Sequence, residues 1–324
     1  MLSILLGARA HLHDPGRDHP EAKERVERLA KSLTDAGYSL RQCPREATRE
    51  ELTMVHDPSY VDYVLSLGGR EVDLDQETHL GRESVQAALN AAGTALELAD
   101  EVLGQDGRQV FAVARPPGHH ARSGAAGGYC VFNNVALAAE RLRRQGLRVG
   151  VLDWDVHHGD GTEQIFFARP DVLFVSIHSD RLFPHDTGDA NTVGFGDGRG
   201  TTVNIPLPGG ATLAAYQLAV RAVVLPAMRR FRPDVVLASL GFDARRGDPQ
   251  GNFLLETEDF AFIGAATSAA AVGSAQGRVG MVLEGGYTLE AIGPCAVAAM
   301  GGLGKSIDQG FPPGAPTAEE RASV

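Results

Sequence analysis

Short apolar runs alternate with longer stretches rich in Ala and Leu along the whole chain. The apolar runs have the length of strands, and several are apolar on both faces, which is typical of a parallel sheet covered by helices on each side. The predicted strands are residues 2–7, 109–114, 147–154, 171–177, 201–207, 234–240 and 278–285. The stretches between them predict helices, notably over residues 82–104, 132–145, 211–230 and 257–275. This alternation predicts an α/β fold with one doubly wound, mainly parallel sheet and helices on both faces.

The pattern continues without an internal repeat or a linker from residue 1 to about residue 305. We therefore predict a single domain over residues 1–305, followed by a C-terminal tail over residues 306–324. The end of the tail, "FPPGAPTAEERASV" (311–324), is polar and rich in proline. Such a composition predicts a segment that lies loosely on the surface.

Polar clusters follow five of the predicted strands. In open parallel sheets, ligands bind beyond the carboxyl ends of the strands, so these clusters are expected on one edge. They are "RPPGHHARSGAAGGYCVFNN" after 109–114, "DWDVHHGDGT" after 147–152, "HSDRLFPHDTG" after 171–177, "GFDARRGDPQGNF" after 234–240 and "EGGYTLEAIG" after 278–283. Five such clusters on one edge indicate an active site.

Two of these clusters carry the residue types of a metal site. Asp155 and His157 stand two positions apart just beyond a strand, where alternate side chains share a face. With Asp243 from another strand end, they form a set of two carboxylates and one imidazole. Three protein ligands with an open position are typical of a catalytic metal centre. The alternative is that the aspartates cap helices or brace glycine-rich turns.

The remaining clusters supply candidates for proton transfer. His119 and His120 are adjacent imidazoles, suited to taking a proton from an activated water and returning it to a leaving amine. Each needs a partner that fixes its tautomer, and Asp153 and Asp160 are the available carboxylates. Tyr287 follows two glycines and could donate a hydrogen bond to a developing oxyanion. Alternatively, the histidines form a turn and the tyrosine packs beneath one.

Composition narrows the choice of partner and location. The formal net charge of −11 argues against nucleic-acid binding, which needs a basic face. Cys43, Cys130 and Cys295 have no paired spacing, so neither a disulfide framework nor a thiolate zinc site is expected. The N-terminal run "MLSILLGARA" predicts a strand rather than a leader, and no run reaches membrane-spanning length. We expect a cytoplasmic protein that binds no membrane, and oligomers are possible.

The motifs "RPPGHHA", "GGYCVFNNVA", "LDWDVHHGDGT", "VSIH", "GFDA" followed by "GDP", and "LEGGY" resemble the arginase–deacetylase superfamily. The nearest resemblance is to class II histone deacetylase-like amidohydrolases, including bacterial acetylpolyamine amidohydrolases. It extends from "HDPGRDHPEAKERV" (13–26) to about residue 305. The resemblance implies the arginase/deacetylase fold and a zinc-dependent deacetylase. Its substrate would be an N-acyl, most often N-acetyl, amide of lysine, a polyamine or a small amine.

The resemblance also implies a role for each site residue. Zinc, one ion per chain, would be held by Asp155, His157 and Asp243. His119 and His120 would transfer protons, paired with Asp153 and Asp160, and Tyr287 would polarise the carbonyl. A structural potassium ion would be held by Asp153, Asp155, His157, Ser176 and Ile177. The acyl tunnel would be walled by Gly128, Tyr129 and Phe183, with Gln250 at its rim.

The chain departs from the family pattern outside the catalytic set. Tyr129 stands where Phe is common, "LFPHDTG" is one residue longer than usual, and "THLGRES" (78–84) lacks the usual Pro-Gly-Ser. Gln250 stands where acetylpolyamine-specific relatives can have a carboxylate, so no strong preference for cationic acetylpolyamines is expected. Two other functions are alternatives: an arginase-like ureohydrolase with two manganese ions, and a catalytically silent protein that binds acyl-lysine.

Overall fold

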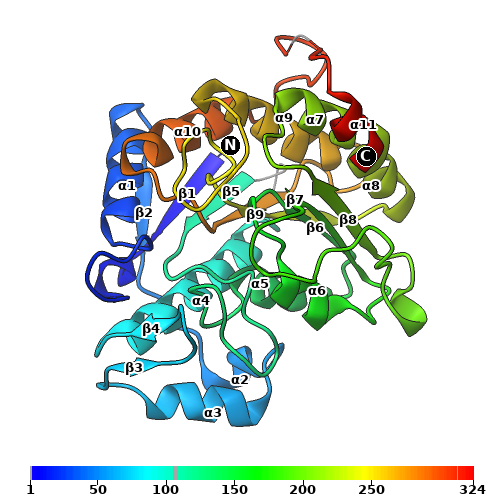
Figure 1. Cartoon of the computed structure of the whole chain (residues 1–324). Coiled ribbons are helices and arrows are strands. Elements are labelled where there is room, and N and C mark those ends of the chain that lie inside the picture. The colour runs from blue at the N-terminus through cyan, green and yellow to red at the C-terminus, as the bar shows by residue number, and fades with distance from the viewer. Residues whose placement is uncertain (1, 105–108, 312) are drawn as a thin grey trace.

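An eight-stranded, fully parallel sheet forms the centre of the computed structural model, which describes residues 2–104, 109–311 and 313–324 (Figure 1). Its strand order is β2-β1-β5-β10-β9-β6-β7-β8. The strands are β1 (Leu2–Gly7), β2 (Leu40–Cys43), β5 (Gln109–Val113), β6 (Val149–Asp153), β7 (Val172–Ser179), β8 (Thr202–Leu207), β9 (Val235–Leu240) and β10 (Val279–Leu283). The two-stranded antiparallel pair β3 (Val72–Asp73) and β4 (His79–Leu80) lies outside this sheet.

Helices cover both faces of the sheet (Figure 1). They are α1 (Glu24–Asp35), α2 (Arg49–Leu52), α3 (Pro58–Ser66), α4 (Ser84–Glu101), α5 (Asn134–Arg143), α6 (Asp160–Phe166), α7 (Leu213–Ala219), α8 (Leu225–Phe231), α9 (Phe260–Ala270), α10 (Leu289–Gly302) and α11 (Ala318–Ser323). Helices α1, α7, α8, α9 and α10 lie on one face, and α4, α5 and α6 on the other.

Alternation along the central strands divides the core into two layers. On β5, Phe111 and Val113 pack with the cluster that contains α9 and α10, whereas Val110 and Ala112 pack with α4 and α5. Because successive side chains of a strand point to opposite faces, a strand covered by helices on both sides must be apolar throughout. A third cluster joins α2, α3 and the β3–β4 pair to the outer side of α4.

The predicted fold class is confirmed, and each of the seven predicted strands is present in the main sheet. Strand β2 was not predicted, because it is an edge strand whose Arg41 and Gln42 are exposed and it carries no apolar run. The stretch predicted as one helix over 211–230 is α7 and α8 joined by a π-helical turn, Val220–Val224. Cys43, Cys130 and Cys295 are buried and free, as expected.

The prediction of a loose C-terminal tail is wrong for its last residues. Thr317 caps α11 with its side chain, and the helix packs against α7 and β8. Glu320 is 2 % exposed, and Val324 packs against the main core cluster. A carboxylate with a specific partner inside the fold overrides the general tendency of polar, proline-rich ends to remain loose. Over the described ranges, no helix combines the length and the apolar character that crossing a membrane requires.

Candidate active site

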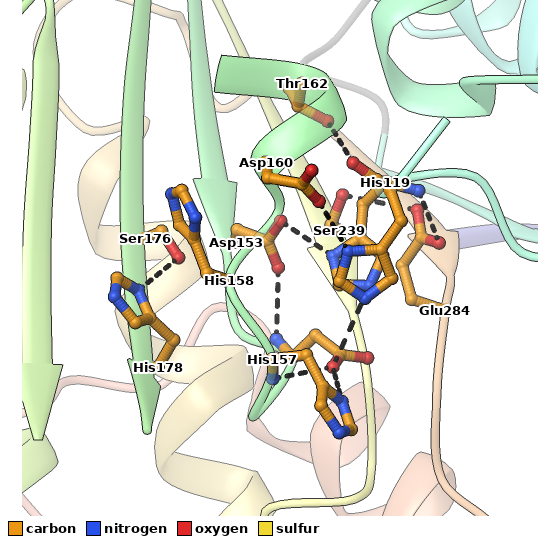
Figure 2. Close-up of polar contacts among 12 residues, drawn as sticks. His119, Asp153, His157, His158, Asp160, Thr162, Ser176, His178, Ser239 and Glu284 are labelled. Atoms are coloured by element: carbon orange, nitrogen blue, oxygen red, sulfur yellow. Dashed lines mark hydrogen bonds and ion pairs between the residues drawn. The ribbon is translucent and has the colours of Figure 1, made fainter. Parts of the chain in front are cut away.

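The five strands that precede the polar clusters are neighbours in the sheet, in the order β5-β10-β9-β6-β7. Since all of them run parallel, their carboxyl ends meet at one edge, and the clusters converge there as predicted. Figure 2 shows side chains from β6 and from the loops beyond β5 and β10 in contact with one another, with Ser176 and His178 of β7 forming a separate contact to one side.

Asp155, His157 and Asp243 lie together and offer three ligand atoms within 4.8 Å of one another. His157 Nε2 contacts the carbonyl oxygen of Gln250 at 3.1 Å, and that oxygen can only accept, so Nε2 carries the proton. His157 Nδ1 is then directed at Asp155 Oδ1 at 2.9 Å and Asp243 Oδ2 at 3.3 Å. The lone pair of His157 Nδ1 therefore faces two carboxylates, and this arrangement is stable only with a proton or a cation between the nitrogen and the carboxylate oxygens.

The charges in this cluster also fit a metal ion. Burial, together with the neighbouring charge of Asp155, raises the pKa of Asp243 to about 7. The Asp243 Oδ2 atom is buried and accepts no hydrogen bond from the described residues. Buried carboxylates are normally paired or bound to metal. Two carboxylates and an imidazole Nδ1 with an open side make a donor set that suits zinc.

Two histidine rings lie beside this cluster, with centroids 4.0 Å apart and planes tilted by 46°, and each ring is bonded to its own carboxylate. His119 Nδ1 lies 3.1 Å from Asp153 Oδ2, and His120 Nδ1 lies 2.8 Å from Asp160 Oδ1. The structure thus brings together the two pairs that the sequence suggested. Because each carboxylate accepts the proton of Nδ1, Nε2 is the atom of His120 that is free to accept another. Both imidazoles are almost fully buried.

The two histidines differ in charge. Burial, together with the neighbouring His119, lowers the pKa of His120 to about 4, so His120 is neutral near pH 7. For His119, burial disfavours the charged form, but the carboxylates of Asp153 and Asp155 outweigh it and hold its pKa well above the usual value. A neutral and a charged imidazole side by side provide a proton acceptor and a proton donor.

Glu284 is a buried carboxylate that sequence reasoning did not single out. It accepts hydrogen bonds from the backbone N–H groups of Gly118 and His119 at 2.7 and 3.1 Å (Figure 2). Burial raises its pKa to about 7. Glu284 therefore ties the loop of the two histidines to the end of β10. The one feature of the sequence that points to Glu284 is its position directly after the apolar run "VGMVL".

Tyr287 is fixed from two sides, again by residues to which the sequence analysis gave no role. Its backbone N–H donates to Asp248 Oδ2 at 2.7 Å, and the Arg25 guanidinium lies 4.7 Å from the centre of its ring. Burial holds the pKa of the phenol well above its usual value, so the hydroxyl keeps its proton. Among the described residues, no acceptor takes that proton, so the hydroxyl can donate to a ligand.

A cavity of about 50 Å³ opens onto these groups. Its lining residues are Glu77, His120, Gly128, Tyr129, His157, Phe183, Gln250 and Tyr287. All four residues predicted for the tunnel and its rim are among them, and Glu77 is the lining residue that sequence reasoning missed. Gly128 has φ +50, and a Cβ there would overlap the His120 ring and lie 2.8 Å from Phe183 Cε1. Only glycine fits this wall.

The residues suggested for potassium surround the start of the same loop. Asp153 and Ser176 are opposite each other in neighbouring strands, β6 and β7. His178 Nε2 contacts the carbonyl oxygen of Gly188 at 3.0 Å, so its unprotonated Nδ1 accepts from Ser176 Oγ at 2.9 Å. Among the described residues, the Ser176 oxygen accepts no hydrogen bond, so its lone pairs can face a cation. Potassium at Asp153, Asp155, His157, Ser176 and Ile177 stays a prediction.

Comparison with known proteins places this site in a family. The family described as "Histone deacetylase domain" matches residues 19–303. The histone deacetylase-like amidohydrolase of Pseudomonas aeruginosa is 39 % identical over 292 residues, which cover 87 % of this chain and 76 % of that protein. The acetylpolyamine amidohydrolase of Burkholderia pseudomallei is 40 % identical over 77 % of this chain and 72 % of its own length.

Longer relatives and solved structures agree. Histone deacetylase 6 of Caenorhabditis elegans is 36 % identical over 90 % of this chain, which spans only 32 % of that protein. The crystal structure of the HDA15 HD domain superposes with a TM-score of 0.86 at 35 % identity, over 92 % of this chain and 89 % of that one. The crystal structure of the acetylpolyamine aminohydrolase from Burkholderia pseudomallei gives a TM-score of 0.83 at 33 % identity, over 93 % and 98 %. The chain therefore belongs to the histone deacetylase domain family and has its arginase/deacetylase fold.

Proposed function

We propose that this protein is a zinc-dependent deacetylase that hydrolyses the N-acetyl amide of an amine. The observation that carries the proposal is the composition of one small cavity. His120, His157 and Tyr287 line it, and the Tyr287 hydroxyl has no acceptor among the described residues. Behind this lining, His157 forms a cluster with two carboxylates, and His120 lies beside His119, each of the two histidines with its own carboxylate partner. Those are the groups that amide hydrolysis needs: an electrophile, a proton acceptor and donor, and a donor for the oxyanion.

Asp155, His157 and Asp243 would hold the zinc ion. When bound there, zinc would polarise the amide carbonyl and lower the pKa of a nearby water. The His157 Nε2 bond to Gln250 fixes the imidazole with Nδ1 turned toward the two carboxylates. The histone deacetylase family in general depends on zinc, which supports this choice of metal.

The side chains divide the proton transfers between them. His120 Nε2 would accept a proton from the attacking water, while Asp160 holds Nδ1 and stabilises the resulting cation. The Tyr287 hydroxyl would donate to the carbonyl oxygen as negative charge develops on it. A protonated imidazole of the pair would then pass a proton to the departing amine nitrogen, which returns the site to its starting charge.

The two other functions considered from the sequence fit less well. An arginase-like binuclear centre needs further carboxylates, yet within the described residues one group of three ligands was found. That function also leaves Tyr287 and the paired histidines without a task. A silent acyl-lysine-binding protein would not need both histidines with matched carboxylates. Potassium binding, a cytoplasmic location and the oligomeric state stay predictions.

The proposal is tested by incubating the zinc-loaded protein with an acetyl-lysine peptide, an acetylated polyamine and a neutral acetylated amine, and measuring released acetate. We expect acetate to be released from at least one of these three substrates. In a separate incubation with arginine, we expect no urea. Binding of acetyl-lysine without any turnover would instead support the silent binding protein.

The lining of the cavity bears on the choice among these substrates. Gln250 is neutral, but Glu77 brings a carboxylate to the same cavity. Asp75 Oδ1 accepts from the backbone N–H of Glu77 at 2.8 Å, and His19 Nε2 donates to the Glu77 carbonyl at 3.3 Å, which fixes the backbone of this residue. The Glu77 carboxylate itself forms no ion pair with the described residues. It is therefore available to a cationic group of a substrate.

We expect Gln250→Glu to improve hydrolysis of acetylspermidine relative to a neutral acetylated amine, mainly through KM. A second carboxylate near a distal ammonium contributes about 1–3 kcal/mol when partly desolvated, so the kcat/KM ratio should rise about tenfold. Glu77→Gln should lower the same ratio. Added salt should weaken both effects, because the opening of the cavity is exposed to solvent and salt screens exposed charges. A ratio unchanged by Gln250→Glu, or a wild-type preference for acetylspermidine of two or more orders of magnitude, would contradict this reading of Gln250.

A further inference from the structure

The C-terminal segment, defined here as residues 313–324, lies outside the part of the chain that matches the family, residues 19–303. It nevertheless docks on the body of the protein, with α11 packed against α7 and β8 (Figure 1). The C-terminal segment buries a carboxylate although it lies outside the shared domain. Specific contacts must therefore hold it against the body of the protein.

The buried carboxylate, Glu320, closes the start of helix α7. Its Oε1 accepts from the backbone N–H of Thr212 at 2.9 Å and from the Thr212 hydroxyl at 3.0 Å. Thr212 is the N-cap residue of α7, and its own side chain caps no backbone N–H. Helix starts leave N–H groups without partners, and a carboxylate there is stabilising. The C-terminal segment thus supplies a cap that the local sequence does not provide.

The residues just before Thr212 support one wall of the cavity. The Gly210 N–H donates to the Asn252 carbonyl, and the Leu254 N–H donates to the Ala211 carbonyl, both at 2.8 Å. These two bonds hold the segment 252–254, which follows the cavity residue Gln250 directly along the chain. Glu320 is therefore connected to the loop that carries Gln250 through its bonds to Thr212, the backbone from Thr212 to Gly210, and the hydrogen bonds of Gly210 and Ala211 to residues 252–254.

Most of the catalytic groups are held by contacts outside this path; the exception is His157, whose Nε2 donates to the backbone carbonyl oxygen of Gln250. Asp248 binds the backbone N–H groups of Tyr287 and Thr288, and each histidine has its own carboxylate. None of these bonds involves residues 208–212. Loosening of the 252–254 segment would therefore disturb the outer wall of the cavity before it disturbs the reacting groups.

We propose that the C-terminal segment, acting through Glu320, is a positioning element for the cavity wall formed by the Gln250 loop. Its effect is on the binding of substrates that extend past the scissile amide. This substrate effect rests on the proposed deacetylase function. The hydrogen-bond coupling between Glu320 and the 252–254 segment does not.

The coupling is tested by hydrogen exchange in Glu320→Ala, with Glu319→Ala as the matched control. Glu319 is the neighbouring residue in the same helix, and its exposed contact with Arg181, at 3.7 Å, contributes little. We expect the backbone amides of Gly210 and Leu254 to exchange about fivefold faster in Glu320→Ala, since loss of one cap costs about 1 kcal/mol. Amides of β6 should be unchanged, and Glu320→Gln, which keeps an acceptor oxygen, should restore most of the protection.

Kinetics of the same three variants test the functional consequence. For an acetyl-lysine peptide, we expect KM to rise about fivefold in Glu320→Ala, the size of one lost cap, with kcat within about twofold. A small acetylated amine that ends near the cavity should be affected much less. Unchanged exchange at Gly210 and Leu254 would overturn the coupling whatever the enzyme does. Faster exchange with unchanged KM for the peptide would overturn the positioning role while leaving the deacetylase function intact.

Discussion

Asp243→Ala is expected to lose bound metal and deacetylase turnover together. Asp243 supplies one of three ligand atoms, and two remaining protein ligands are too few for a stable zinc site. Metal analysis of the purified protein should give about one zinc per chain for the wild type and close to none for the variant. Asp197→Ala, which changes an exposed aspartate far from the metal ligands in sequence, serves as the control and should retain zinc and turnover.

A thermal measurement separates loss of metal from loss of fold. Because burial and Asp155 raise the pKa of Asp243, the metal-free wild type holds two carboxylates that repel each other in its interior. Zinc should therefore raise the melting temperature of the wild type, since a ligand that binds only the native state stabilises it. Asp243→Ala should melt cooperatively and show no such rise. A variant that keeps zinc and turnover would remove Asp243 from the proposed site.

Tyr287→Phe is expected to lower kcat by about 10²–10³, the usual loss for one oxyanion donor. The change removes only a hydroxyl that has no acceptor among the described residues, so the fold should be unaffected. KM should change much less, because the interaction grows as the transition state forms.

Tyr129→Phe is the matched control for this experiment. Tyr129 lines the same cavity, its ring lies 5.8 Å from the Tyr287 ring, and the substitution removes the same atom. We expect its kcat to stay within about threefold of the wild type, because nothing assigns its hydroxyl to the reacting carbonyl. Near wild-type turnover in Tyr287→Phe, or equal losses in both variants, would contradict a specific role for Tyr287.

The stretch "VLDWDVHHGD" (151–160) shows why the centre of the site could be predicted from sequence. An apolar run that turns abruptly into aspartates and histidines has few explanations in a protein interior, where each polar group needs a partner. The strand rule then placed His119, Asp243 and Tyr287 on the same edge. The structure brings all of these residues together.

The features that were missed depend on contacts between distant segments. Glu284 and Arg25 act through the backbones of other loops, so neither carries a local pattern. Glu77 reaches the cavity from the β3–β4 turn, a segment that no strand-end rule points to. The tail looked loose because proline and polar residues dominate it, and only the position of Thr212 shows why Glu320 is buried.

The most direct test of the account is a zinc titration of the metal-stripped protein, with acetate release from an acetyl-lysine peptide, an acetylated polyamine or a neutral acetylated amine as the readout. The geometry of Asp155, His157 and Asp243 predicts that acetate release from the best substrate rises linearly and reaches its plateau at about one equivalent of zinc per chain. No acetate from any of the three at any zinc level, or activity that requires two equivalents of metal and yields urea from arginine, would contradict it.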